Sequence, residues 1–525
     1  MFKKQTLLFL SIYSFFILTQ LNGQNMPPCP NVLVINENPI PSSNYSSAHA
    51  IWSAGKVDSM SNIVMKANDF VALDYGFEVK EQATFLASLD GCISDCEEQL
   101  PICEGEPCPP IPYELDSLNR KYEPNSVLVS LPQELQVNQD YALLIQLYLD
   151  TMSQTPTGMS QLKRCMCEEN IFIYESNIDI NEESTIGQAT AGYRPRGEGV
   201  TYSLNYYLEP DFADKDDDTP TTMFNPNSFG ESVSQTQHNI IAFLDSGVDP
   251  ALMPPQVIRQ NPPDPCFIDD MYGWNFVDDN NNILDDRGHG TTAILSYLNA
   301  LNQIGVPLSS QVILPVKVLD GCGRGTIYSV VCGLYYARRK GAKIINNSWG
   351  MYFNDVQLQN AMIDINNSAI AVSCSAGNSA KDLDNEEHFP SGYAQDYTKI
   401  RRDYTSVDTS GLAFVFEVGG LCRGMSNSMP APIVPLWPES NHRDFMFVEA
   451  AIRVEDLLNI IPNIPEPIMC GISGTSYAAP RLTAGLIHFC QNSPAGTAIT
   501  QAAVFSNSQQ INPSNDHYSY ILDKL

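Results

Sequence analysis

The stretch NIIAFLD, residues 239–245, is an unbroken apolar run that ends in an aspartate. Four similar runs follow it: VILPVKVL (312–319), AKIINNS (342–348), AIAVSCSAGN (369–378) and FMFVEA (445–450). Continuous apolar residues, as opposed to alternating ones, are typical of strands that are buried on both faces. Helical stretches are predicted at 291–303, 326–339 and 476–490. Residues 238–525 are therefore predicted to form an α/β domain, a parallel sheet with helices on both faces.

The chain begins with a predicted signal peptide, residues 1–23. Lys3 and Lys4 precede an apolar run over 7–18, and polar and small residues follow. A signal anchor is the alternative, but no second apolar run of membrane length follows, so we expect no further transmembrane segment. The chain has 29 basic and 60 acidic residues, a net charge of −31. This charge argues against nucleic acid or an anionic membrane surface as a partner and suits a secreted or cell-surface protein.

Fourteen cysteines in an exported chain are more readily explained as disulfide partners than as metal ligands. Several lie close together in the first third, for example Cys103 and Cys108, or Cys165 and Cys167. Neighbouring positions do not reveal which cysteines pair, and the connectivity stays open. No spacing is typical of a zinc site, so no metal site is predicted from the cysteines. Cys374, inside an apolar run, is expected to be a core residue or half of a disulfide.

The first third is predicted to carry a small all-β module at 31–92, where short apolar stretches alternate with Gly and Asn. This segment resembles the three-coathanger stack module of secreted proteins, which implies attachment or spacing and no chemistry. Residues 93–124 are rich in Pro, Glu and Cys and are interpreted as a linker held by cysteines.

A small α+β unit is predicted at 125–175, from the strand-like runs VLVSL (127–131) and IFIYE (171–175). Between them, helical spacing is shown by Tyr141, Leu144, Ile145 and Tyr148. The next stretch, 176–237, is polar and rich in Asp, and we interpret it as a linker or processing region.

Four polar residues lie where the α/β domain should carry its chemistry, at strand ends and helix starts. Asp245 ends the first run, and His289 stands between two glycines ahead of a predicted helix. Asn378 closes SAGN, and Ser476 lies in GTS at the start of the last helix. Each alone has an ordinary explanation, such as a turn or a helix cap. Pro480, four residues after Ser476, is expected in the first turn of that helix, where no backbone N–H is needed.

Taken together, DSGVD, GHGT, NNSWG, SAGN and GTSYAAP over 238–491 resemble the motifs of the subtilisin-like serine proteases. The resemblance implies a Ser476 nucleophile, a His289 general base and an Asp245 that orients the imidazole. Asn378 and the backbone N–H of Ser476 would stabilise the oxyanion. The implied function is a secreted serine endopeptidase of protein or peptide substrates. The unit at 125–175 could then be a propeptide that inhibits and aids folding, or simply another domain.

The resemblance also implies two edge segments that would hold an extended peptide by strand pairing. These substrate-binding candidates are Gly323, Arg324, Gly325, Ser348, Trp349 and Gly350. No cofactor is expected to be required. A structural calcium ion is possible at VDDNNNILDD (277–286), through Asp278, Asn280 and Asp285, although a solvated turn is the simpler interpretation. The alternative function is a catalytically silent protease-fold adhesin or binding protein, and we expect a monomer.

Overall fold

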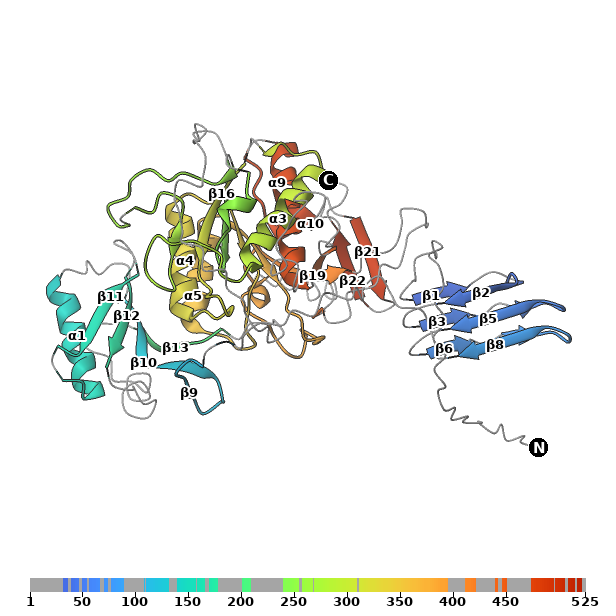
Figure 1. Ribbon diagram of the computed structural model, residues 1–525, viewed down its shortest axis with the longest axis horizontal. Coiled ribbons are helices and arrows are strands. Elements are labelled where there is room, and N and C mark those ends of the chain that lie inside the picture. Colours follow the sequence, from blue (N-terminus) through green and yellow to red (C-terminus); the bar gives the residue numbers. More distant parts are fainter. Residues whose placement is uncertain are drawn as a thin grey trace, which may run out of the picture. The chain divides into compact units, whose positions relative to one another are not determined.

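The computed structural model (Figure 1) describes residues 32–35, 39–46, 50–53, 56–66, 70–73, 77–88, 108, 110–131, 139–156, 158–165, 170–177, 201–208, 239–254, 257–267, 269–308, 311–394, 411–421, 440–441, 446–450, 474–494, 496–505, 509–514 and 517–521. The predicted signal peptide lies outside these residues. Within them, no helix has the length and apolar character needed to cross a membrane. The chain divides into two compact units, Met1–Ser94 and Asp95–Leu525.

The first unit is all-β, as predicted, and is built from repeated coils. One parallel sheet contains β1 (Val32–Ile35), β3 (Ala50–Ser53) and β6 (Phe70–Leu73); a second contains β2 (Ser43–Ser46), β5 (Asn62–Lys66) and β8 (Thr84–Ser88); β4 (Lys56–Val57) pairs with β7 (Glu78–Val79). Val32 pairs with Ala50 and Ala50 with Phe70, so each coil uses about 20 residues. The coils stack over buried Ile35, Ile40, Ile51, Val57, Ile63 and Met65.

The second unit contains an antiparallel sheet that precedes the large domain. Its strands are β9 (Glu114–Leu115), β10 (Lys121–Ser130), β11 (Ser160–Arg164), β12 (Ile171–Ser176) and β13 (Thr201–Tyr206), with the order β11-β12-β10-β13 and β9 beside β10. Helix α1 (Gln139–Ser153) buries Ile145 and Leu149. The prediction that Leu144 shares this face is wrong, because its side chain is 62% exposed.

The predicted boundaries of this small domain differ from the observed sheet. β13 falls within 176–237, which we interpreted as a linker, and it pairs with β10 from Leu204 and Val127 to Thr201 and Ser130. β9 and the start of β10 fall in the predicted linker 93–124. We call residues 108–208 the α+β domain. Tyr202, Leu204 and Tyr206 alternate with polar residues, a pattern that identifies β13 in the sequence.

The large domain is the predicted α/β fold, built on a nine-stranded sheet. Its order is β15 (Trp274–Asn275), β16 (Gln311–Lys317), β14 (Asn239–Asp245), β17 (Ile344–Asn347), β18 (Ala371–Ser375), β19 (Val415–Leu421), β20 (Met446–Ala450), β22 (His517–Ile521) and β21 (Gln509–Ser514). All neighbours are parallel except β21 and β22. The predicted strands at 239–245, 312–319, 342–348, 369–378 and 445–450 are confirmed, whereas β19 was not predicted.

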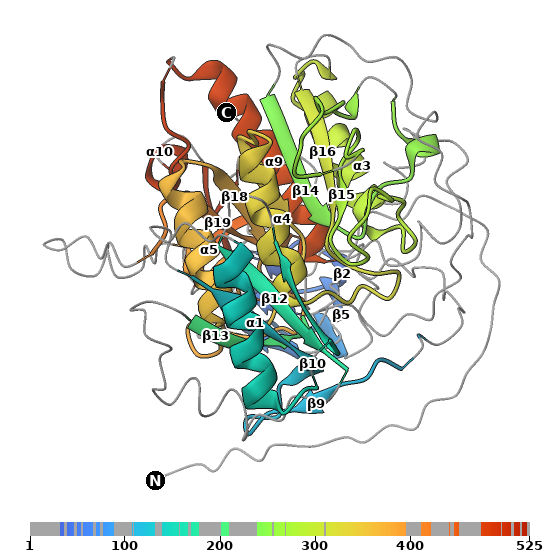
Figure 2. The same cartoon turned by 90° about the vertical axis from the view of Figure 1, so that its left-hand side faces the viewer.

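Helices cover both faces of this sheet, as predicted. Ile241 and Phe243 of β14 pack in one core with α3 (His289–Gln303) and α9 (Thr475–Asn492). The alternate residues Ala242 and Leu244 pack in a second core with α4 (Ile327–Arg339) and α5 (Val356–Asn367). Figures 1 and 2 show these helix pairs on opposite sides of the sheet. The other helices among the described residues are short: η3 (Pro250–Leu252), η6 (Ser391–Tyr393) and α10 (Gln501–Phe505).

Candidate active site

Asp245 and His289 meet at the carboxyl edge of the sheet. Asp245 is the last residue of β14, and His289 is the first residue of α3. The Nδ1 atom of His289 lies 2.7 Å from Oδ1 of Asp245, and both side chains are buried. The backbone N–H of Ser246 donates to the same carboxylate oxygen at 2.7 Å. This arrangement holds the imidazole by one nitrogen and fixes its orientation.

Asp285 organises the turn that carries His289. Its carboxylate accepts backbone N–H bonds from Arg287, Gly288 and Thr291, at 3.1, 2.8 and 2.7 Å, and a 2.6 Å bond from the Thr291 hydroxyl. Ser246 Oγ donates to it at 2.8 Å. The N-cap residue of α3, Gly288, has no side chain to accept a hydrogen bond, so Asp285 supplies the acceptor that this helix start needs.

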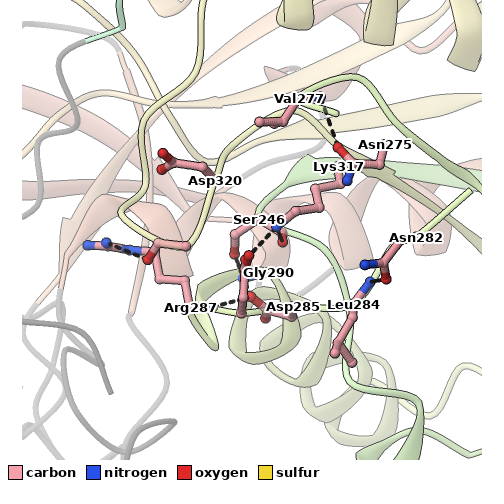
Figure 3. Close-up of polar contacts among 12 residues, drawn as sticks. Ser246, Asn275, Val277, Asn282, Leu284, Asp285, Arg287, Gly290, Lys317 and Asp320 are labelled. Atoms are coloured by element: carbon pink, nitrogen blue, oxygen red, sulfur yellow. Dashed lines mark hydrogen bonds and ion pairs between the residues drawn. The ribbon is translucent and has the colours of Figure 1, made fainter. Parts of the chain in front are cut away.

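Lys317 supports the same turn from β16. It is buried, its Nζ donates to the Ser246 carbonyl at 2.6 Å, and it forms an ion pair with Asp286. Figure 3 shows Lys317, Ser246 and Asp285 around the start of α3. Burial raises the pKa of Asp285, but the Thr291 hydrogen bonds and the Lys317 charge outweigh it, so its pKa lies below the usual value. Sequence reasoning missed Lys317, although a lysine inside the run VILPVKVL is a usable signal.

Of the three residues predicted to hold a calcium ion, Asp285 is the one whose surroundings do not fit a metal ligand. The Asp285 carboxylate is occupied by protein donors, so it is not available to a cation. Asp278 accepts a 3.0 Å bond from the Asn275 amide, and Asn280 pairs with Asn275 through its backbone. Across the part of the chain that the structure describes, no three His, Cys, Asp or Glu residues are grouped to hold a metal ion. A calcium ion at Asp278 and Asn280 stays a prediction.

Ser476 lies at the start of α9, as predicted, and is its second residue. It is buried, and its Oγ donates to the Ser348 carbonyl at 3.2 Å. The ring of the next residue, Tyr477, lies 5.2 Å from the His289 ring, centroid to centroid. The structure therefore brings the start of α9 beside the start of α3. The helix begins from Gly474, whose φ of +108° is suited to glycine.

The predicted place of Pro480 is wrong, and the difference links Ser476 to Ser348. Pro480 is the sixth residue of α9, in the helix interior, where a backbone N–H would normally donate to the Ser476 carbonyl. Proline has no N–H, and the Ser348 hydroxyl donates to that carbonyl at 2.7 Å. Asn346 in turn donates to Ser348 Oγ at 2.9 Å. The missing helical bond is thereby replaced by a contact that ties β17 to the serine.

Asn378 is oriented by the residue before Ser476. Its Oδ1 accepts bonds from the Thr475 backbone N–H and the Thr475 hydroxyl, both at 2.9 Å. With the oxygen fixed in this way, Nδ2 is the end of the amide that can donate to another group. A side chain at Gly474 would meet the Asn378 amide at 2.8 Å, so glycine is needed there for space as well as for backbone conformation.

The two predicted substrate edges have different surroundings. Ser348, Trp349 and Gly350 are buried, with Ser348 against Ser476 and Gly350 against His388. Gly323, Arg324 and Gly325 belong to a loop that is closed by Asp320, whose carboxylate accepts from the backbone N–H groups of Cys322 and Arg324. A side chain at Gly323 would meet the Arg287 guanidinium at 2.9 Å, which places this loop beside the turn that carries His289. Peptide binding at both edges stays a prediction.

A family model described as the subtilase family, Peptidase_S8, matches residues 236–518. The chain belongs to the subtilase family. The cell wall-associated protease of Bacillus subtilis is 38% identical over 116 residues, which are 21% of this chain and 12% of that protein. Thermitase of Thermoactinomyces vulgaris is 35% identical over 127 residues, 23% of this chain and 44% of the relative. The chain thus spans less than half of the length of either curated relative.

Solved structures of subtilisin-like enzymes are also similar. Fervidolysin from Fervidobacterium pennivorans has a TM-score of 0.47 at 15% identity, over 80% of this chain and 62% of that chain. A cold-adapted subtilisin-like serine proteinase has a TM-score of 0.37 at 19% identity, over 56% of this chain and 91% of that chain.

Replacing Asp285 with asparagine should lower the free energy of unfolding by about 3 kcal/mol at pH 7, because buried donors lose a charged acceptor. The pKa of Asp285 is lowered by folding, so its stabilisation is present above the unfolded pKa of about 3.9 and is lost as the pH falls through the folded pKa. The difference from the parent should therefore shrink between pH 7 and pH 2. Urea denaturation of Ser476→Ala protein, with and without Asp285→Asn, measures it. A difference that is the same at both pH values contradicts this role, and exposed Asp382→Asn is the control.

Proposed function

We propose that this chain is a secreted serine endopeptidase that cleaves peptide bonds through an acyl-enzyme on Ser476. The observation that carries the proposal is the buried 2.7 Å contact between Asp245 and His289, at the edge of the sheet where α9 also presents Ser476. Membership of the subtilase family supports the same reading. The Tyr477 ring beside His289 and the Thr475 bonds to Asn378 support a common site at the starts of α3 and α9, and they give no support to the silent binding protein.

In the proposed reaction, the Ser476 hydroxyl leaves the Ser348 carbonyl and turns toward Nε2 of His289. Hydrogen bonds of this kind are often long or misaligned before substrate binds, and they tighten in the complex. His289 takes the hydroxyl proton as Oγ bonds to the substrate carbonyl carbon. The imidazolium, held by Asp245 through Nδ1, then gives the proton to the leaving amine as the C–N bond breaks. Water repeats the sequence on the ester and releases the acid.

Negative charge on the substrate oxygen requires donors fixed before the reaction. We propose Nδ2 of Asn378 as one donor, because the two Thr475 bonds already hold the amide oxygen. The backbone N–H of Ser476 is the second proposed donor. The first N–H groups of α9 have no acceptor within the helix, and they lie at the positive end of the helix dipole. Substrate would be an extended peptide between the edge segments at 323–325 and 348–350.

Purified protein should cleave denatured casein, and His289→Ala protein should not. Cleavage by both, at equal rates, would show that another enzyme in the preparation is responsible. The leader-like sequence at 1–23 supports export, which is tested by recovering the protein in the medium of the cells that make it.

Replacing Asn378 with alanine should lower kcat by about 10²- to 10³-fold, the loss seen when the equivalent donor of subtilisin is removed. The effect should fall on kcat and leave KM nearly unchanged, because the donor acts on charge that develops in the transition state. Steady-state hydrolysis of a chromogenic peptide measures both constants. The matched control is Asn385→Ala, an exposed asparagine of the turn that follows. A change in KM alone would assign Asn378 to substrate binding.

A further inference from the structure

Among the described residues, two disulfides join the α+β domain to the large domain. Cys108 is bonded to Cys322, in the loop after β16, with 5.9 Å between their Cα atoms. Cys165, at the end of β11, is bonded to Cys332, inside α4, with 5.5 Å between their Cα atoms. Cys108 and Cys165 precede residue 209, whereas Cys322 and Cys332 follow residue 238. The segment that connects the domains is therefore bypassed twice by covalent bonds.

A continuous apolar core also joins the two domains. Tyr122, Tyr206 and Leu208 of the α+β domain belong to the same buried cluster as Leu319, Ile327 and Trp349 of the large domain. Figure 2 shows the α+β domain over α4 and α5. The Cys165 and Cys332 side chains are in this core, at 5% and 0% exposure. An apolar interface of this kind, resembling a domain core cut in two, is typical of permanent association.

Polar contacts across the interface supply partners for groups of the large domain. Asn205 Oδ1 accepts the backbone N–H of Tyr328 at 3.0 Å, and so satisfies one of the first N–H groups of α4. The Arg120 guanidinium lies 5.1 Å from the ring of Phe353 and 4.5 Å from that of Tyr206. Removal of the α+β domain would leave this helix start without its acceptor and the Phe353 ring without the contact of Arg120.

The end of β13 contacts the predicted substrate loop itself. The backbone N–H of Leu208 donates to the Gly325 carbonyl at 2.9 Å, and Tyr207 forms an antiparallel bridge with Thr326. A side chain at Gly325 would lie 2.9 Å from the Leu319 side chain and 3.3 Å from the Leu208 side chain, so Leu208 packs against this glycine together with Leu319. Cys322 lies in this loop as well. The α+β domain thus holds the loop by a disulfide, a backbone bond and a buried side chain.

We propose that the α+β domain is a permanent part of the mature protein, which remains covalently attached after any cut between residues 209 and 238. This decides between the two interpretations of the unit at 125–175: it is a retained domain and not a removable propeptide. Release would require a thiol reductant to convert each disulfide to two thiols, and burial of Cys165 and Cys332 restricts attack by a thiolate. The proposal does not depend on whether the chain hydrolyses peptides.

The test uses full-length Ser476→Ala protein with one recognition site for a sequence-specific endoprotease placed between 209 and 238. After cutting, a denaturing gel without reductant should show one band of full size. The same sample with dithiothreitol should show two fragments. Two fragments without reductant would overturn the proposal. Because the serine is absent, the result is separate from any failure of the proposed activity.

Paired cysteine variants make the test specific. Protein with Cys108→Ser and Cys322→Ser should still give one band without reductant, because the other disulfide remains, and so should protein with Cys165→Ser and Cys332→Ser. The fourfold variant lacks both of these bonds, and two bands from it would show that they are the covalent link. One band from it would show a further disulfide between the domains, which also keeps them attached. If the altered proteins fail to fold, mass spectrometry of the unaltered, non-reduced protein decides: it should find peptides joined through Cys108 and Cys322 and through Cys165 and Cys332. Pairing of both Cys108 and Cys165 within residues 1–208 would contradict the proposal.

Discussion

Replacing Ser476 with alanine should lower kcat by about 10⁶-fold, the loss seen when the nucleophile of subtilisin is removed. The Ser476 hydroxyl is the group expected to form the acyl-enzyme. Alanine leaves the backbone intact, both at Gly474 and at the Ser476 carbonyl that accepts from Ser348. The variant should therefore fold as the parent does. The initial rate of peptide hydrolysis, at matched concentrations of folded protein, measures the loss.

Ser368→Ala is the control for this change, because Ser368 is an exposed serine at the end of α5. It should hydrolyse peptide at the parental rate. If Ser476→Ala protein kept more than a hundredth of the parental rate, with its melting temperature unchanged, Ser476 would not be the nucleophile.

Replacing Asp245 with asparagine should lower kcat by about 10⁴-fold, as for the equivalent aspartate of other serine proteases. The carboxylate receives both the His289 Nδ1 contact and the Ser246 N–H, each at 2.7 Å. An amide in its place favours the wrong imidazole tautomer and gives no negative charge to the imidazolium. The pH dependence of kcat/KM separates this effect from a loss of folded protein. A loss of folded protein should lower kcat/KM by the same factor at every pH, whereas loss of the carboxylate should change the pH profile of the remaining activity.

Exposed Asp384→Asn is the control for charge, since it removes one carboxylate from the same domain without touching the site. It should leave the rate and the pH profile unchanged. An Asp245→Asn protein with parental kcat would mean that the buried pair serves stability alone.

Five strands of the parallel sheet and the positions of Asp245, His289, Asn378 and Ser476 at strand ends and helix starts could be predicted, because each depends on local sequence. Unbroken apolar runs identify strands buried on both faces, and parallel strands bring their carboxyl ends to one edge. Asp245 and the SAGN motif of Asn378 lie at such ends, and the glycines around His289 and Ser476 mark helix starts. The structure shows the Asp245 to His289 contact that these positions made possible.

The features that could not be predicted depend on contacts between distant parts of the chain. The role of Pro480 depends on Ser348, which donates to the carbonyl that the proline leaves without a partner in the helix. The sequence indicates a solvated turn or a calcium ligand at Asp285, because the donors to its carboxylate come from a turn whose shape the sequence does not give. Cysteine spacing does not determine pairing, so the bonds of Cys108 and Cys165 to the large domain appear only in the folded chain.

The most direct measurement is labelling of the purified protein with a fluorophosphonate probe, which bonds only to a serine activated by a neighbouring base, followed by identification of the modified peptide by mass spectrometry. We predict one label, on Ser476, which is absent from Ser476→Ala and His289→Ala proteins. A label on another residue, or folded wild-type protein that cleaves casein while Ser476 stays unmodified, would contradict the proposed catalytic site.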